Sequence, residues 1–298
     1  MEIELRRVVK GFGRMRALDG IDCRIPAGRK VALIGPNGSG KSTLIRVIMG
    51  LLGCEGEVRL DGKAPFEDRI AVARRLAYVP QLPPQLAAPV GELVATVALT
   101  RGIDQGRIAA IARRLALDLD AVAARRFRDL SGGMKQKLLL ALAFASDPSL
   151  LILDEPTASL DAHARDRFFQ LVTELPEEVT VILCSHRLEE MRHLADHVLA
   201  LDEGKIVYDG PAAAYLGGSA FSSLEVCVED PALASRLAAL GFRKGAGDWW
   251  LRTVARDEKI AALEAVNDRV GGGLVDVLVR DLESIVVLEA GKEDRQHG

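Results

Sequence analysis

The nine residues GPNGSGKST, at positions 35–43, follow an apolar run at 31–34 and precede an amphipathic stretch at 44–49. This order predicts a strand, a glycine-rich loop and a helix, which is the setting of a phosphate-binding P-loop. The glycines let successive backbone N–H groups converge on one anion, and the helix adds positive charge at its N-terminus. Lys41 can reach the β- and γ-phosphates, and the Ser42 hydroxyl suits Mg²⁺. The stretch therefore predicts a nucleoside triphosphate site rather than a chance glycine-rich turn.

Composition limits what the rest of the chain can be. The 298 residues suffice for two domains, and 49% hydrophobic with 27% charged residues is an ordinary globular mixture. A net charge of −3 provides no overall basic field, so we expect no nucleic-acid partner. The four cysteines lack metal or redox spacing, as in a reducing cytosol. We find neither a signal peptide nor an apolar run of about 18 residues, so we expect any membrane role to come through a partner.

A second glycine-containing segment, LSGG at 130–133, precedes a stretch rich in Leu and Ala at 134–146. Ser131 is typical of a helix N-cap. Two glycines directly behind a cap are poor helix formers, but they suit a backbone that must approach a ligand closely. The sequence therefore predicts a second anion-binding helix terminus.

The run LLILDE, at 150–155, is continuously apolar until its two carboxylates. Such a run predicts a buried parallel strand that carries charge at its carboxyl end. Asp154 suits a direct or water-mediated contact with Mg²⁺, and Glu155 suits activation of the attacking water. The alternative is a strand followed by the acidic first turn of a helix.

Three further side chains are placed near the predicted site by strand ends or loops. Gln81 ends the strand predicted at 76–81, and His186 follows the strand predicted at 179–184. A lone histidine is usually structural, but one at the carboxyl end of a strand beside a P-loop favours a site role. Phe12, between Gly11 and Gly13, is predicted on a loop, where its ring either stacks on a base or fills the core. The residues alone favour the core.

Taken together and in this order, these elements resemble the nucleotide-binding (ATPase) subunit of ATP-binding cassette (ABC) transporters. The resemblance covers residues 1 to about 216 and implies an α/β fold: a P-loop NTPase (RecA-like) core with an N-terminal antiparallel β subdomain and a helical subdomain at about 85–146. Beyond it we predict a linker at 217–222, a small α+β accessory domain at 223–291 and a tail at 292–298. The accessory domain is expected to contain a strand centred on Trp249 and Trp250, and a last helix from Leu282.

The resemblance also implies a role for each matching residue. It makes Glu155 the general base, His186 the γ-phosphate contact, and Gln81 and Lys41 further catalytic groups. Mg²⁺ would be held by Ser42, Gln81 and Asp154. Phe12 would stack on adenine, which reverses the preference for the core. The implied ATP-binding residues are Phe12, Gly35, Pro36, Asn37, Gly38, Ser39, Gly40, Lys41, Ser42, Thr43, Ser131, Gly132, Gly133 and Asp161.

By the same resemblance, two copies of the chain sandwich two ATP molecules head to tail. Each site then combines one copy's P-loop with Ser131, Gly132 and Gly133 of the other. Met134 departs from the family, which usually has glutamine there, and we interpret this as a difference of subtype. Because Glu155 and His186 are both present, an inactive regulatory cassette is disfavoured.

The implied function is ATP hydrolysis that powers a membrane transporter. The permease would be a separate chain, and the ATPase subunit would bind it at the cytoplasmic face of the cell membrane. The short single cassette with its accessory segment resembles exporters of the ABC-2 class, so we expect an exporter. The alternative is a soluble ABC-type ATPase with an assembly role, such as Fe–S or metalloenzyme maturation.

Overall fold

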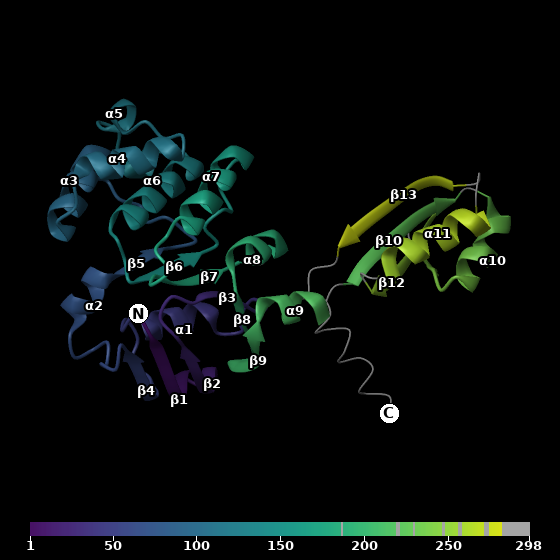
Figure 1. Ribbon diagram of the computed structural model, residues 1–298, viewed down its shortest axis with the longest axis horizontal. Helices are drawn as coiled ribbons and strands as arrows, with labels where there is room; N and C mark the ends of the chain where they lie inside the picture. Colours follow the sequence, from purple (N-terminus) through teal and green to yellow (C-terminus); the bar gives the residue numbers. More distant parts are fainter. Residues whose placement is uncertain are drawn as a thin grey trace. The chain divides into compact units, whose positions relative to one another are not determined.

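A computed structural model of the chain describes residues 1–185, 187–218, 221–228, 230–245, 248–255, 258–270 and 274–281. Its contacts divide the chain into two compact units, Met1–Ala213 and Ala214–Gly298, which are described separately. The first unit contains a six-stranded sheet and a three-stranded sheet, and the second contains a four-stranded sheet (Figure 1).

The six-stranded sheet organises the first unit. Its strands, in spatial order, are β5 (Leu76–Val79), β6 (Leu150–Asp154), β7 (Thr180–Cys184), β3 (Lys30–Ile34), β8 (His197–Asp202) and β9 (Lys205–Pro211). The first five are parallel, and β9 joins antiparallel to β8 through a tight hairpin at Glu203 and Gly204. All carboxyl ends of the five parallel strands therefore meet at one edge of the sheet.

Strand β6 shows how this sheet separates two cores. Leu150 and Ile152 belong to one hydrophobic cluster, whereas Leu151 and Leu153 belong to another, and all four are fully buried. Successive side chains of a strand point to opposite faces, so a continuous apolar run can line both. Each such side chain contributes about 1.5–3 kcal/mol through burial.

Helices fill the layer on one face of the sheet. Leu151 and Leu153 pack in a cluster with residues from α3 (Val90–Arg101), α4 (Gln105–Arg114), α5 (Leu119–Val122), α6 (Gly132–Ala145) and α7 (Ala162–Thr173). Helix α3 ends at Gly102, which has the left-handed conformation (φ 67°) that glycine adopts most easily. This layer contains the helical subdomain that the sequence predicts (Figure 1).

The opposite face packs against helix α1 (Lys41–Ile48) and a small antiparallel sheet of order β2-β1-β4. Its strands are β1 (Ile3–Phe12), β2 (Met15–Ile25) and β4 (Glu55–Leu60). The sequence predicts Phe12 on a loop because glycines flank it, and this is wrong: Phe12 is the last residue of β1 and pairs with Met15. The glycines instead permit the sharp return of the chain at Gly13 (φ 59°).

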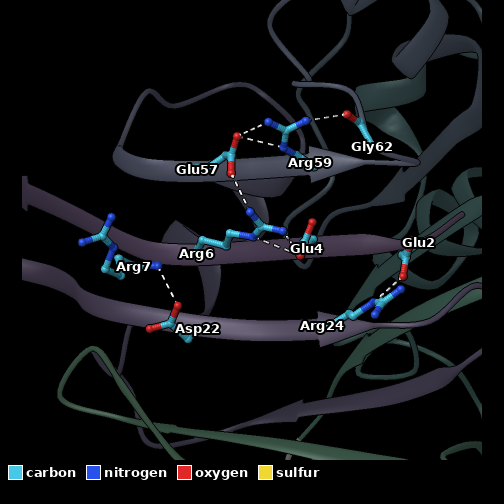
Figure 2. Close-up of polar contacts among 9 residues, drawn as sticks. All are labelled: Glu2, Glu4, Arg6, Arg7, Asp22, Arg24, Glu57, Arg59 and Gly62. Atoms are coloured by element: carbon cyan, nitrogen blue, oxygen red, sulfur yellow. Dashed lines mark hydrogen bonds and ion pairs between the residues drawn. The ribbon is translucent and has the colours of Figure 1, made fainter.

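The outer face of the antiparallel sheet carries charged side chains of alternating sign (Figure 2). The guanidinium of Arg24 lies 2.6 Å from the Glu2 carboxylate. Arg6 lies 2.7 Å from Glu4 and 3.6 Å from Glu57, which also pairs with Arg59. Exposed pairs of this kind stabilise a fold by about 0–1 kcal/mol each. Their clearer effect is to keep the open face of the sheet solvated.

Two shorter helices of the first unit are α2 (Arg69–Arg75) and α8 (Leu188–Leu194), and α9 (Ala212–Gly218) spans the boundary at Ala213. Helix α9 includes Gly217 and Gly218, and the following strand begins at Phe221, so most of the predicted linker lies in regular structure. Residues 219–220 lie outside the described residues, as do 282–298, where the sequence predicts a helix from Leu282 and the tail.

The second unit has the chain order β10 (Phe221–Val228), α10 (Pro231–Ala239), β11 (Arg243–Lys244), β12 (Trp249–Ala255), α11 (Lys259–Val270) and β13 (Leu274–Asp281). Its antiparallel sheet has the order β11-β12-β10-β13, which is a βαββαβ arrangement. Leu224, Val226 and Leu237 are fully buried, and Trp250 packs against this core. The predicted α/β fold class, with its antiparallel subdomain and small C-terminal α+β part, is confirmed.

Candidate nucleotide site

Four loops converge at the carboxyl edge of the six-stranded sheet. The P-loop follows β3, Gln81 lies after β5, Asp154 ends β6, and Ser185 follows β7. Cys184 of β7 pairs with Leu33 of β3 on one side and with Asp154 on the other. The strand ends that carry the P-loop and the two carboxylates are therefore separated by a single strand.

Glycine is required at two positions of the P-loop. Gly35 (φ 144°) and Gly40 (φ 106°) both occupy backbone regions that other residues rarely adopt. A Cβ atom on Gly35 would lie 2.1 Å from the Leu201 carbonyl oxygen, and one on Gly40 would lie 2.4 Å from that of Ala17. Strands β8 and β2 thus contact the loop backbone closely and restrict the path that it can take.

Hydrogen bonds hold the loop to the β8–β9 hairpin and to itself. The Gly204 N–H donates to the Ser39 carbonyl (3.0 Å), and the Asp19 N–H donates to the Gly204 carbonyl (2.8 Å). The Lys41 ammonium donates to the carbonyls of Gly35 (2.6 Å) and Pro36 (3.0 Å). Bound phosphates would offer this ammonium stronger, charged acceptors.

The polar atoms of the P-loop fit a triphosphate. Ser39 is buried, and within the part of the chain that the structure describes its hydroxyl has no hydrogen-bond partner. Such an unsatisfied buried group marks a site that a ligand or water completes. Asn37, Gly38 and Ser42 are exposed, whereas Thr43 is half-buried. The loop therefore presents both backbone N–H groups and hydroxyls to the space above the sheet.

Asp154 is a half-buried carboxylate whose partner the sequence did not predict. The Tyr78 hydroxyl, from the neighbouring strand β5, donates to it over 3.4 Å. Burial raises the pKa of Asp154, and the nearby Glu155 charge adds to this, whereas Lys41 acts in the opposite direction. Burial and Asp154 together raise the pKa of Tyr78 to about 12, so the phenol stays a donor. An aromatic hydroxyl three residues before Gln81 is the signal that could have revealed this pair.

Glu155 occupies a turn of unusual geometry. It has φ 49°, which non-glycine residues adopt infrequently. Its N–H donates to the Cys184 carbonyl (2.8 Å) and its own carbonyl accepts from the Ala158 N–H (3.3 Å). The chain therefore turns sharply at the sheet edge, and backbone bonds on both sides of Glu155 fix that turn.

The other predicted side chains are placed as follows. Gln81 is exposed beyond β5. Phe12 is 46% exposed at the tip of the β1–β2 hairpin, with the Lys10 ammonium 5.4 Å from its ring centroid. An aromatic face exposed in this way is available for stacking. His186 lies outside the described residues.

The second predicted anion-binding segment begins helix α6. Ser131 is its N-cap, and the Ser131 hydroxyl accepts from the Met134 N–H (3.3 Å). A Cβ atom on Gly133 would lie 2.8 Å from the Ser159 carbonyl oxygen, so this glycine permits close packing. Met134 is half-buried and packs against the helical core, where an apolar side chain is favourable. This packing accounts for the departure from glutamine in physical terms.

Asp161 links α6 to the segment after β6. Its carboxylate accepts from the Ala164 N–H (2.8 Å) as the N-cap of α7, and it lies 3.0 Å from the Lys137 ammonium. The Ala164 N–H and then Lys137 lower the pKa of Asp161. The carboxylate thus stays charged and exposed beside Lys137 of α6.

The two glycine-rich segments precede helices that lie in different layers of the first unit. Helix α1, which follows the P-loop, packs in the cluster that contains Leu150 and Ile152, whereas α6 packs in the cluster that contains Leu151 and Leu153. The two helices therefore cover opposite faces of the sheet, as Figure 1 also shows. One P-loop and one Ser131 segment from the same copy belong to different layers.

Two further observations bear on ligands and partners. Over the described residues, no group of three or more His, Cys, Asp or Glu side chains is arranged to hold a metal ion. Likewise, none of the helices in the described ranges is both long enough and apolar enough to cross a membrane.

Comparisons with known proteins agree on one family. The ABC transporter family model matches residues 18–158. The chain is 34% identical to the sulfate/thiosulfate import ATP-binding protein CysA of Bradyrhizobium diazoefficiens, over 85% of this chain and 80% of the relative. It is also 34% identical to the Nod factor export ATP-binding protein I of Paraburkholderia xenovorans, over 80% of this chain and 81% of the relative. A solved ATP-binding subunit of an ABC transporter superposes with a TM-score of 0.67 at 26% identity, covering 72% of this chain and 92% of that one.

These comparisons leave one expectation unsupported and confirm another. The chain is also 40% identical to the nickel import ATP-binding protein NikO of Rhodobacter capsulatus, over 73% of this chain and 92% of the relative. More of the similar proteins are named for import than for export, so the predicted exporter subtype has no support. The resemblance to ATP-binding subunits, in contrast, extends over most of the chain in both sequence and structure. The chain belongs to the ABC transporter family and is one of its ATP-binding subunits, an ATPase.

Proposed function

We propose that the chain binds ATP with Mg²⁺ at the carboxyl edge of the six-stranded sheet and hydrolyses it there. The observation that carries this proposal is the convergence of the P-loop, Asp154 and Glu155 at that edge. The P-loop amides and Lys41 bind the phosphates, and the exposed Phe12 ring stacks on the adenine. Phosphoryl transfer then depends on positioning and charge neutralisation.

The oxygen donors near the P-loop fit Mg²⁺, which prefers carboxylate, hydroxyl and amide oxygens. Ser42, Asp154 and Gln81 would hold it, and its chemistry there would be to neutralise charge on the phosphate oxygens. Glu155 takes the proton from the attacking water, since its carboxylate follows Asp154 directly. His186 completes the proposed site as the γ-phosphate contact.

We further propose that two copies form the active unit, head to tail. The support is the placement of α1 and α6 on opposite faces of the sheet. In a two-fold pair, each nucleotide site combines the P-loop of one copy with Ser131, Gly132 and Gly133 of its partner. Asp161, exposed beside Lys137, belongs to the same contact surface.

The purified chain should hydrolyse ATP in the presence of Mg²⁺, and hydrolysis should stop when EDTA removes the metal. Lys41→Ala should bind ATP at least about tenfold more weakly, because it removes the charged donor to the phosphates. Nucleotide binding by fluorescence and phosphate release by colorimetry measure the two effects. Turnover that persists in EDTA at the level seen with Mg²⁺ would contradict the proposed metal role.

We also propose that the chain works with a separate membrane permease, and therefore at the cytoplasmic face of the membrane. Exposed large apolar side chains near β5 and α3 support this: Leu82 is 82% exposed and Leu99 is 86% exposed. Arg101 donates to the carbonyls of Arg74 (3.4 Å) and Leu76 (3.0 Å), which joins the end of α3 to α2 and β5. Large apolar side chains that are exposed in this way are available for burial in a contact with a partner.

Co-sedimentation with membranes of the native host tests this partner. Replacing Leu82 and Leu99 by Glu together should reduce the bound fraction about tenfold, because two charges would have to be desolvated in the contact. Ile260→Glu is the matched control, since Ile260 is also exposed (67%) but belongs to the second unit. Wild-type protein that never sediments would favour the soluble assembly role instead.

We propose residues 1–216 as the ATPase domain and 223–291 as an accessory domain that packs or dimerises. The division of contacts at Ala213 and the separate core of the second unit support this. Within the described residues of this unit, the four-stranded sheet and two helices form a hydrophobic core that includes Leu224 and Val226.

A further inference from the structure

Glu190 is a buried carboxylate that has no role in the ATP site proposed above. It is the third residue of α8 and is only 1% exposed, whereas its neighbour Glu189 is exposed. Acidic residues favour the first turn of a helix because of its positive end, but an exposed residue such as Glu189 already meets that preference. Burial of a second carboxylate is costly unless hydrogen bonds compensate for it. Its partners therefore indicate why it is there.

The first partner comes from the turn that contains Glu155. The Thr157 hydroxyl donates to the Oε1 atom of Glu190, and Thr157 is itself only 1% exposed. Thr157 lies two residues after Glu155, within the turn that carries the left-handed backbone of Glu155. A bond at Thr157 thus restrains the direction in which that turn leaves β6.

The second set of partners comes from the loop after β7. The Ser185 hydroxyl is close enough to Glu190 to lower its pKa, and the Arg187 Nε atom lies 3.9 Å from Oε1. The Arg187 N–H donates to the Ser185 hydroxyl oxygen (3.0 Å), which leaves the hydroxyl proton for the carboxylate. These two residues flank position 186.

One carboxylate therefore meets two segments that are 28 or more residues apart in sequence and that each adjoin a proposed catalytic residue. Burial raises the pKa of Glu190, and the Glu155 charge adds to this, whereas both hydroxyls and Arg187 lower it. Acceptors in such low-dielectric surroundings make strong, directional bonds. Glu190 is therefore placed to connect the segment after β6 to the segment after β7.

We propose that Glu190 is a positioning residue that holds the Glu155 turn in register with Ser185 and Arg187 for ATP hydrolysis. It acts through Thr157 and Ser185 and does not touch the nucleotide. The inference rests on the proposed function, because it assigns Glu190 to the same ATP site.

Thr157→Val and Thr157→Ser form a matched pair. Valine replaces the hydroxyl by a methyl group, whereas serine keeps the hydroxyl. Misplacement of a catalytic group by a fraction of an ångström lowers turnover strongly, so we expect Thr157→Val to lower kcat about tenfold or more. The KM for ATP should stay within about twofold, because the P-loop is unchanged. Thr157→Ser should restore kcat to within about threefold of wild type.

A double variant separates positioning from folding. Thr157→Val leaves a buried carboxylate without its donor, so the protein is also made with Thr157→Val and Glu190→Met together. Removing both polar partners is often nearly neutral for stability. We expect the unfolding temperature of this variant to lie within a few degrees of that of wild type. Its kcat should stay as low as that of Thr157→Val, and its ATP binding should be intact.

The outcomes are distinct. A low kcat with wild-type KM, rescued by Thr157→Ser, supports the inference. Wild-type kcat in the double variant, or a serine variant no better than the valine variant, overturns it while leaving ATP hydrolysis by this chain established. Wild-type protein without any Mg²⁺-dependent hydrolysis overturns the proposed function, and the inference with it.

Discussion

Glu155→Gln should reduce the steady-state rate of ATP hydrolysis about 100- to 1,000-fold, because an amide cannot take the proton of the attacking water. Glutamine has nearly the same shape as glutamate and loses only the charge, so the left-handed turn at position 155 should persist. ATP binding should therefore be retained. With hydrolysis blocked and ATP and Mg²⁺ present, the variant should accumulate as a nucleotide-bound dimer, which size-exclusion chromatography with light scattering measures.

Glu177→Gln provides the matched control. Glu177 is an exposed carboxylate in the loop that precedes β7, so it lies at the opposite edge of the sheet from Glu155. This variant should hydrolyse ATP like wild type and show no trapped dimer. A Glu155→Gln protein that keeps more than about a tenth of wild-type turnover would exclude Glu155 as the general base.

Mixing two inactive variants should restore ATP hydrolysis if each site draws on both copies. Lys41→Ala disables the P-loop, and Ser131→Arg places a bulky cation where the partner's nucleotide would lie. In a mixed dimer, one site combines the intact P-loop of the second variant with the intact Ser131 segment of the first. With random pairing, half of the dimers are mixed and each has one working site of two. The mixture should therefore reach about a quarter of wild-type activity.

A different mixture shows whether such rescue requires composite sites. Lys41 and Glu155 of one copy belong to the same site. In the mixed dimer of Lys41→Ala and Glu155→Gln, every site therefore carries one defect. This mixture should stay as inactive as its components. Equal rescue in both mixtures, or none in either while each dimer still forms with ATP, would contradict the head-to-tail arrangement. Hydrolysis by wild-type protein that remains monomeric would contradict it as well.

The strands that form the nucleotide edge were predictable because their sequences are simple. Residues 31–34 and 150–153 are uninterrupted apolar runs, as expected for strands buried on both faces. Strands β1 and β2 are less regular. Their pairing shifts between Leu5 and Val8, next to Arg7 with its φ of 46°, and such an irregularity breaks the two-residue alternation on which strand prediction depends.

The site was predictable where one local segment supplies it and not where distant segments meet. The P-loop and the Ser131 helix terminus each lie within a few consecutive residues. In contrast, Tyr78 meets Asp154 across 76 positions, and Thr157 meets Glu190 across 33. Those pairs depend on strand order and on helix packing, which the spacing of residues in one sequence does not specify.

The course of the P-loop is imposed by its neighbours, and this has a thermodynamic consequence. Strand β2, the end of β8 and the Gly204 hairpin all contact the loop. Backbone entropy that folding has already removed is not lost a second time on binding, so the loop is preorganised for phosphate. The chief rearrangement left for binding is the exchange of the Lys41 ammonium from two carbonyl oxygens to the phosphates. Nucleotide affinity in this chain should thus depend on charge more than on the ordering of the loop.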